Sequence, residues 1–157
     1  MKAAVDELKK RGLTLCVCES CTGGLIGAEI CSVPGASEAF AGGLITYTER
    51  TKVLLAGVDP ETIRRYGVVS ERTAAEMAEG ARRACGADIG LSVTGYAGPT
   101  GDEVGKVCFG ISSGERTETV TKRFPGGRDE VRRSAAEFAL KQLTAFLTKT
   151  IDNGGRL

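Results

Sequence analysis

The sequence predicts an α/β protein, built as a single-domain three-layer sandwich with helices on both faces of a mixed sheet. Three features point to this fold class. The apolar runs at residues 13–18 and 88–94 are continuous, which is typical of strands buried on both faces. Segments with helical spacing alternate with the strands, as in sheets with parallel neighbours. A hairpin pattern at residues 104–124 then adds antiparallel strands.

The first part of the chain has the pattern of a helix, a strand, a turn and a second helix. Residues 2–11 have amphipathic spacing and lead into the apolar strand at 13–18. A glycine-rich turn at 19–24 interrupts the apolar run, and helical spacing resumes over 25–33. The expected order is therefore strand, glycine-rich turn, helix.

Capping residues mark the helices in the middle of the chain. Asp59 as N-cap with Pro60 in the first turn begins one short helix, and Ser70 caps a longer one. Gly67 and Gly86 end these two helices. The expected elements are a strand at 40–48 and helices at 49–56, 60–66 and 71–85.

The last part of the chain is expected to complete the sheet and cover it. Ser113-Gly114 lies at the tip of the hairpin, and a final helix follows Gly127. Residues 152–157 are expected to fray. No linker or repeat divides the sequence, so residues 1–157 should form one domain with its core at about 8–147. The elements expected here are strands at 88–94, 104–112 and 118–124 and a helix at 128–149.

Composition excludes several classes of function. The 157 residues carry 21 Lys+Arg against 20 Asp+Glu, with 5% aromatic residues and no Trp, so the basic aromatic surface of a nucleic-acid binder is absent. No apolar run is long enough to span a membrane. The absence of His excludes Ser-His and Cys-His catalytic pairs. A base that works near neutral pH must then be a carboxylate, Lys, Tyr or the N-terminal amine.

The six cysteines are expected to stay reduced. The N-terminus lacks the apolar core of a signal peptide, which predicts a cytoplasmic protein. Cys18 and Cys21 have the spacing of a metal or redox site, but no second pair and no His completes a ligand set. Neither a metal nor a cofactor is therefore expected. Four others lie in apolar segments and should be buried free thiols: Cys16, Cys31, Cys85 and Cys108.

Two loops at the carboxyl ends of predicted strands could carry chemistry, at 19–24 and 94–101. In the first, Ser20 precedes a helix start where backbone N–H groups could form an oxyanion hole. The alternative is that Ser20 or Thr22 only caps the helix. The second loop could hold a phosphate or carboxylate, or could simply be a turn. The residues that would supply backbone contacts are Thr22, Gly23 and Gly24 in the first loop and Thr94, Gly95 and Gly98 in the second.

Lys52 is the candidate base for a serine nucleophile in a chain without His. Tyr47 ends the predicted strand before it, so both side chains could approach Ser20 if that strand neighbours the first. Alternatively, Lys52 is a solvated helix residue and Tyr47 an edge aromatic. Cys21 at the helix N-terminus is a second candidate nucleophile.

Taken together, the motifs resemble those of the CinA C-terminal domain family, the nicotinamide-nucleotide amidases. The resemblance covers the chain from about Leu8 to Leu147 and is specific because the motifs occur in one order. They are Glu19-Ser-Cys-Thr-Gly-Gly24, Val33-Pro-Gly, Ile45-Thr-Tyr47 followed by Lys52, Gly67-Val-Val-Ser70, Met77-Ala-Glu-Gly80 and Val93-Thr-Gly-Tyr-Ala-Gly-Pro99.

This resemblance implies hydrolysis of the carboxamide of nicotinamide mononucleotide to nicotinate mononucleotide and ammonia, without metal. It implies Ser20 as the nucleophile, Lys52 as the general base and Tyr47 as a partner in proton transfer or orientation. Arg128 matches an arginine that would contact the nucleotide phosphate. The loop with Thr94 matches the family's second glycine loop. The resemblance further implies a stand-alone form of the domain that assembles as a homo-oligomer.

The chain departs from the family pattern after Pro99. Relatives commonly have a longer glycine-rich stretch ending in Lys-Pro-Val-Gly, whereas residues 99–105 read Pro-Thr-Gly-Asp-Glu-Val-Gly. Relatives also commonly have Ser-Asn-Glu-Ala-Lys where residues 48–52 read Thr-Glu-Arg-Thr-Lys. Two alternatives to the nicotinamide-nucleotide amidase therefore stay open: a nucleotide-binding module without turnover, and an amidase for a different carboxamide nucleotide.

Overall fold

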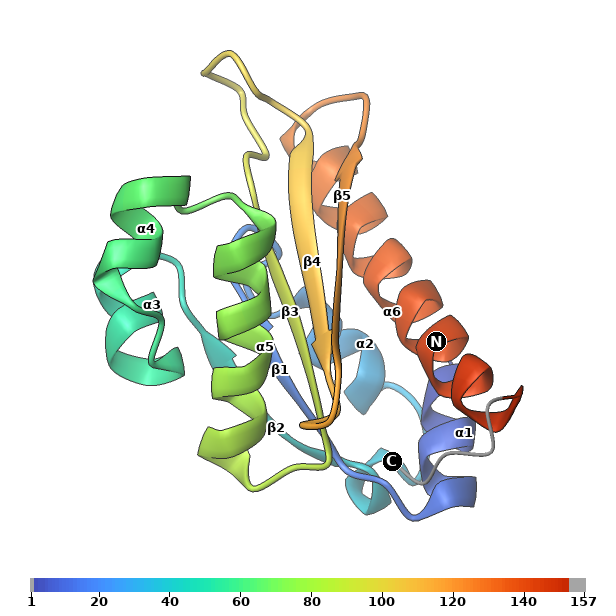
Figure 1. Cartoon of the computed structure of the whole chain (residues 1–157). Coiled ribbons are helices and arrows are strands. Elements are labelled where there is room, and N and C mark those ends of the chain that lie inside the picture. Colours follow the sequence, from blue (N-terminus) through green and yellow to red (C-terminus); the bar gives the residue numbers. More distant parts are fainter. Residues whose placement is uncertain (1, 153–157) are drawn as a thin grey trace.

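The computed structural model describes residues 2–152 of the chain, with side chains described for residues 2–149 (Figure 1). Each helix and strand expected from the sequence is present, with boundaries that differ by a few residues. Of the tail expected to fray, residues 153–157 lie outside the described residues. The elements are α1 (Lys2–Arg11), β1 (Leu15–Glu19), α2 (Leu25–Cys31), the 3₁₀ helix η1 (Ala36–Glu38), β2 (Phe40–Ile45), α3 (Glu49–Ala56), α4 (Pro60–Tyr66), α5 (Glu71–Cys85), β3 (Ile89–Gly95), β4 (Lys106–Ser112), β5 (Thr117–Arg123) and α6 (Arg128–Asp152).

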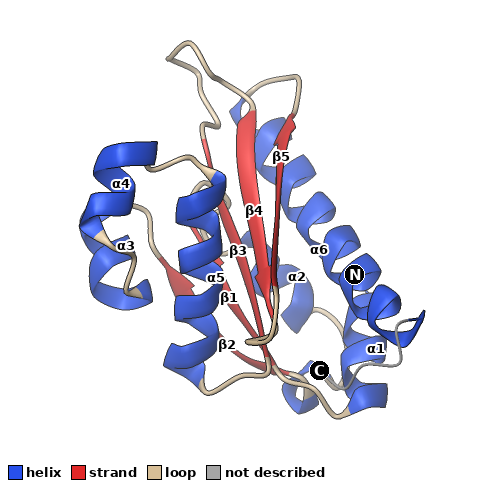
Figure 2. Ribbon diagram, in the orientation of Figure 1, coloured by secondary structure: helices blue, strands red, loops and turns tan. Residues whose placement is uncertain are grey.

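The strands form one mixed sheet in the order β2-β1-β3-β4-β5 (Figure 2). β1 pairs in parallel with β2 on one side and with β3 on the other, while β4 and β5 add antiparallel strands. The carboxyl ends of β1, β2 and β3 therefore meet at one edge of the sheet, where α/β proteins bind ligands. This topology confirms the predicted fold class.

Helices cover both faces of the sheet. α5, with α3 and α4 beside it, lies on one face, and α1, α2 and α6 lie on the other (Figure 1). Alternate side chains of β1 enter the two layers: Leu15 and Val17 join the core under α6, and Cys16 and Cys18 join the core under α5. The continuous apolar run of β1 is explained by burial on both faces. No helix in the described part of the chain is long and apolar enough to cross a membrane.

The cysteine prediction is wrong at three positions. Cys16 and Cys85 form a disulfide with Cα atoms 6.2 Å apart, because the last turn of α5 packs over the face of β1 on which Cys16 lies. Cys31 is exposed, since the buried side of α2 is formed by Ile26 and Ile30. Cys108 is a buried free thiol, as predicted, and so are Cys18 and Cys21.

α5 packs closely against α3 because Gly80 has no side chain. A Cβ atom added at Gly80 would overlap the carbonyl oxygen of Ala56, the last residue of α3. A Cβ atom added at Gly90 of β3 would similarly overlap the carbonyl oxygen of Ala78. These contacts are with backbone, which cannot move aside as a flexible side chain can. The two glycines therefore fix the position of α5, and through α3 they support Lys52.

Gly80→Ala should destabilise the protein, although the same change in an ordinary helix interior is stabilising. The overlap with Ala56 should lower the free energy of unfolding by about 1–3 kcal/mol, measured by urea denaturation. Gly27→Ala in α2 is the matched control, because its added Cβ would meet only ordinary van der Waals contacts. We expect that variant to be unchanged or up to about 1 kcal/mol more stable. A stable Gly80→Ala variant would contradict the close packing of α3 and α5.

Candidate functional site

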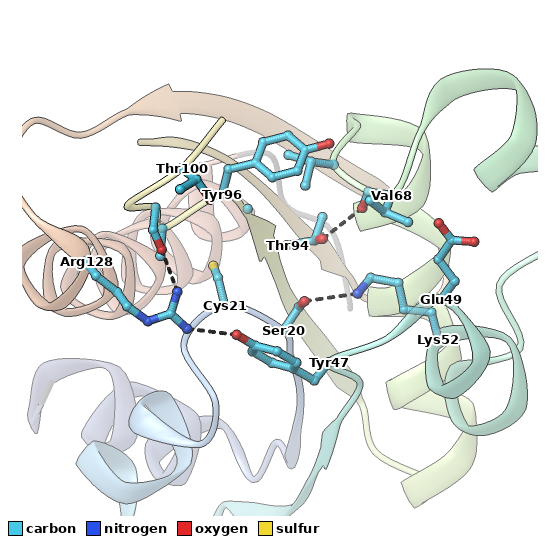
Figure 3. A pocket seen from close by; sticks show the side chains of 14 residues that line it. Ser20, Cys21, Tyr47, Glu49, Lys52, Val68, Thr94, Tyr96, Thr100 and Arg128 are labelled. Atoms are coloured by element: carbon cyan, nitrogen blue, oxygen red, sulfur yellow. Dashed lines mark hydrogen bonds between the residues drawn. The ribbon is translucent and has the colours of Figure 1, made fainter. Parts of the chain in front are cut away.

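A cavity of about 300 Å³ opens at the carboxyl ends of the parallel strands (Figure 3). Residues that follow β1, β2 and β3 line it together with the first residues of α3 and α6. The structure thus brings together Ser20, Tyr47, Lys52 and Arg128, which lie in separate segments of the sequence. The lining residues are Ser20, Cys21, Tyr47, Glu49, Lys52, Val68, Val69, Thr94, Gly95, Tyr96, Ala97, Gly98, Thr100 and Arg128.

Ser20 and Lys52 form a buried hydrogen-bonded pair. Lys52 Nζ lies 3.0 Å from Ser20 Oγ and donates to the carbonyl oxygen of Thr46 at 2.7 Å. Only 2% of Lys52 and 7% of Ser20 is exposed, so Lys52 is not a solvated helix residue. Burial lowers the pKa of the Lys52 amine below its ordinary value, because desolvation penalises the charged form. A lysine in this environment is suited to act as a base.

The end of β2 and the capped start of α3 position the Lys52 side chain. Thr48 caps α3, and its hydroxyl accepts from the Thr51 N–H while Thr51 bonds back to the Thr48 backbone. The Thr46 N–H donates to the Glu19 carbonyl oxygen at 2.7 Å, which continues the pairing of β1 and β2. Lys52 therefore reaches the point where β1 and β2 both end.

Cys21 lines the same cavity but is poorly suited to be the nucleophile. Burial raises the pKa of its thiol to about 11, so the thiol stays protonated near neutral pH. The Cys18 thiol is affected in the same way and bonds the Thr46 hydroxyl at 3.3 Å. Between the two candidate nucleophiles, the geometry and the pKa directions favour Ser20.

Tyr47 lies beside Arg128. The Tyr47 hydroxyl accepts from Arg128 Nη2 at 2.8 Å, and Arg128 Nη1 donates to the Gly98 carbonyl oxygen at 2.7 Å (Figure 3). The hydrogen bonds of the described residues do not link Tyr47 to Ser20 or Lys52. The Thr46 carbonyl, one residue earlier, orients the amine instead. Tyr47 is 57% exposed and borders the cavity mouth with the Arg128 cation.

The turn after Ser20 differs from the sequence expectation. The Gly23 N–H donates to the Ser20 carbonyl oxygen, and the Gly24 N–H donates to the Glu19 carboxylate. Both N–H groups are engaged within the turn, so they do not form the expected oxyanion hole. Thr22 is fully buried and, like these two glycines, does not line the cavity.

Glu19 is the residue that caps α2. Its buried carboxylate accepts from the N–H groups of Gly24, Ile26 and Gly27 at 2.9, 3.2 and 2.8 Å. These are donors that a helix start leaves without intrahelical partners, and the carboxylate also favours the positive end of the helix dipole. The alternative that Ser20 or Thr22 caps the helix is therefore wrong.

The second glycine loop lies on the cavity wall. Thr94 Oγ1 donates to the Val68 carbonyl oxygen at 2.8 Å, which joins the end of β3 to the segment before α5. Gly95 and Gly98 line the cavity directly. A Cβ atom at Gly95 would lie 2.9 Å from the carbonyl oxygen of Lys106, and Gly98 has a φ of +82°, so both positions require glycine.

Three residues without a predicted role hold the site from outside the cavity: Glu19, Thr46 and Arg132. Arg132 donates to the carbonyl oxygens of Cys21 and Thr22 at 3.1 Å each. Arg132 lies four residues after Arg128, so both residues lie on one side of α6. This spacing could have linked Arg132 to the site. Glu19 is a charged residue at the end of an apolar run, just before the glycine-rich turn that leads into α2, and could have been recognised as a cap.

Fold and site together define a three-layer α/β protein with a buried serine–lysine pair at the carboxyl ends of its parallel strands. The chain belongs to the CinA C-terminal domain family, whose family model matches residues 1–147.

Similar proteins agree with this assignment. A CinA-like protein of Acidobacterium capsulatum is 48% identical over 85% of this chain and 33% of its own length, and one of Myxococcus xanthus is 46% identical over 91% and 35%. The chain thus spans about a third of the curated relatives it matches. A CinA superfamily protein of Enterobacter cloacae has a TM-score of 0.90 and 35% identity, covering 93% of this chain and 89% of that one. A competence or damage-inducible protein of Enterobacter asburiae has a TM-score of 0.90 and 37% identity, covering 93% and 94%.

Glu19→Ala should destabilise the protein, because it leaves N–H donors at the start of α2 without their acceptor. We expect the free energy of unfolding to fall by about 2 kcal/mol or more in urea denaturation. Glu137→Ala, an exposed carboxylate on α6, is the control and should change it by less than about 0.5 kcal/mol. Equal effects of the two substitutions would mean that the Glu19 carboxylate does not stabilise α2.

Proposed function

We propose that this site is an amidase centre that hydrolyses the carboxamide of nicotinamide mononucleotide to nicotinate mononucleotide and ammonia. The observation that carries the proposal is the contact of Lys52 Nζ with Ser20 Oγ, 3.0 Å apart and buried, at a cavity that also holds the Arg128 cation. A nucleophile, a base and a group able to bind a phosphate are what this reaction requires. The resemblance of the motifs to nicotinamide-nucleotide amidases supports the same substrate.

Acylation begins with a neutral Lys52 amine. The amine takes the Ser20 proton as Oγ attacks the carboxamide carbon, and the carbonyl π electrons move to the oxygen of a tetrahedral intermediate. When the intermediate collapses, the C–N bond breaks and protonated Lys52 gives its proton to the departing nitrogen. Ammonia leaves, and an ester joins the substrate acyl group to Ser20.

Deacylation uses the same amine with water. Lys52 takes a proton from a water molecule that attacks the ester carbon, and the proton then returns to Ser20 Oγ as the C–O bond breaks. The products are nicotinate mononucleotide and the free enzyme. The Thr46 carbonyl holds one N–H of the amine, which directs the lone pair of the neutral form toward Ser20.

The rest of the cavity supplies contacts suited to a pyridine nucleotide. Val68, Val69 and Tyr96 provide apolar and aromatic surface for a flat ring. Arg128 at the start of α6 presents a fixed cation to a phosphate, and the helix dipole adds to its attraction. The carboxylate of Glu49 also borders the cavity and disfavours a second anion on that side.

Ammonia release from a panel of carboxamide nucleotides tests the proposal. Nicotinamide mononucleotide should be turned over, and Ser20→Ala and Lys52→Ala should each lower kcat by a factor of about 10⁴ or more without loss of folding. Because the pKa of Lys52 is lowered, kcat/KM should rise with pH and level off below 10.5. Arg50→Gln, which alters an exposed residue of α3 that does not line the cavity, is a control that should retain near-normal kcat.

Each alternative gives a different result in the same assay. Release of ammonia only from another member of the panel would assign the site to a different carboxamide. Tight nucleotide binding with no ammonia from any member would indicate a binding module. Full activity of Ser20→Ala would contradict the serine mechanism and direct attention to Cys21.

A further inference from the structure

The turn formed by residues 20–24, here called the nucleophile turn, is held by two charged side chains. Glu19 bonds N–H groups at its end, and Arg132 of α6 bonds carbonyl oxygens in its middle. Neither contact reaches into the cavity, because neither Glu19 nor Arg132 is among the lining residues. The two side chains therefore determine the shape of the turn without being able to touch a ligand there.

Arg132 contacts two consecutive peptide groups. Nε donates to the Cys21 carbonyl oxygen and Nη2 donates to the Thr22 carbonyl oxygen, each at 3.1 Å. The side chain is 28% exposed, and Nη1 lies 3.5 Å from the more exposed Asp129. The rigid fork of a guanidinium can hold two acceptors in a fixed relation, which a lysine amine cannot do.

The orientation of each peptide N–H follows from these bonds. In a trans peptide the N–H points opposite to the C=O of the same unit. The Thr22 N–H belongs to the unit whose carbonyl is bound by Arg132, so it is directed away from Arg132. The Gly23 N–H belongs to the unit whose Thr22 carbonyl is bound by Arg132, and it donates to the Ser20 carbonyl. The Cys21 N–H belongs to that Ser20 unit, so its direction is fixed through Gly23.

Except at Cys21 and Thr22, the N–H groups of the nucleophile turn, and that of Leu25 after it, have acceptors. The Ser20 N–H donates to the Val93 carbonyl oxygen. Those of Gly23, Gly24 and Leu25 donate to Ser20, Glu19 and Thr22. Among the described residues, the Thr22 N–H has no acceptor, and the Cys21 N–H has none outside its own residue. Of these two residues only Cys21 lines the cavity, since Thr22 is fully buried, and the residue after a nucleophile commonly supplies an oxyanion-hole donor.

We propose that Arg132 is a positioning residue for the reaction: by holding the carbonyl oxygens of Cys21 and Thr22, it fixes the turn in which the Cys21 N–H serves as an oxyanion-hole donor. The inference rests on the proposed function, in which an oxyanion forms beside Ser20. α6 then contributes two residues to the site: Arg128 lines the cavity, and Arg132, one helical turn later, holds the nucleophile turn.

Apolar packing joins α6 to the sheet and to α2 independently of Arg132. Val131, Ala135 and Ala139 of α6 are buried in the core, and Leu25 of α2 packs against the same core. Loss of the arginine should thus leave the fold intact and loosen only the turn. A displacement of about 1 Å in a catalytic group can cost about 100-fold in rate.

The test compares Arg132→Gln, Arg132→Lys and the control Arg133→Gln, which alters the exposed neighbour on α6. Two rates are measured: kcat for ammonia release, and the second-order rate of Ser20 labelling by a fluorophosphonate probe. In labelling, Ser20 Oγ bonds phosphorus, fluoride leaves and Lys52 takes the serine proton. This reaction also develops charge on an oxygen beside Ser20 but needs no carboxamide. Thermal unfolding confirms that each variant is folded.

We expect Arg132→Gln to lower both rates by about 10- to 100-fold with KM changed by less than about threefold. Arg132→Lys should lie between Arg132→Gln and the wild type, and Arg133→Gln should stay within about twofold of the wild type. Labelling of Arg132→Gln at the wild-type rate, a raised KM at unchanged kcat, or full recovery in Arg132→Lys would overturn the proposal.

The labelling rate separates this inference from the proposed function. A wild-type protein labelled at Ser20 that releases no ammonia from any carboxamide would refute the amidase, and the labelling rates alone would then decide the role of Arg132. A wild-type protein that is not labelled at Ser20 would overturn the positioning role as well.

Discussion

The site depends on the burial of one amine at the point where two parallel strands end. Lys52 Nζ has the Thr46 carbonyl and the Ser20 hydroxyl as partners, and water has almost no access to it. Burial of this kind favours the neutral amine, which is the form a base requires. The arrangement is possible because Glu19 pairs with Ile45 across β1 and β2, so that Ser20 and Thr46 follow at the same level.

The shape of the turn after Ser20 is the second constraint, and it is set from distant parts of the chain. The Glu19 carboxylate takes the donors at the start of α2, while Arg132 approaches from α6, more than 100 residues later. Charged groups that are buried or partly buried are held by several hydrogen bonds each, as such groups require. The turn is thus held on the sides that face the protein, with the Cys21 N–H next to Ser20 at the cavity.

Much of the fold was predictable because its signals are local. The apolar run of β1, the N-caps Asp59 and Ser70 and the Ser113-Gly114 turn mark their elements within a few residues. Ser20 and Lys52 were predictable from the absence of His together with the family motifs. The contacts of Arg132 and the Cys16–Cys85 disulfide could not be predicted in this way. Residue spacing within one segment does not indicate which distant segments pack together after folding.

The most direct test of a buried, neutral base is the titration of Lys52 itself. Its side-chain signal can be followed by carbon-13 and nitrogen-15 NMR in the free protein and assigned by its loss in Lys52→Arg. We expect a pKa below the ordinary lysine value of 10.5, and a further change of the signal when Ser20 is replaced by Ala. A Lys52 that titrates at or above 10.5 would contradict it, because a charged amine cannot take a proton from Ser20.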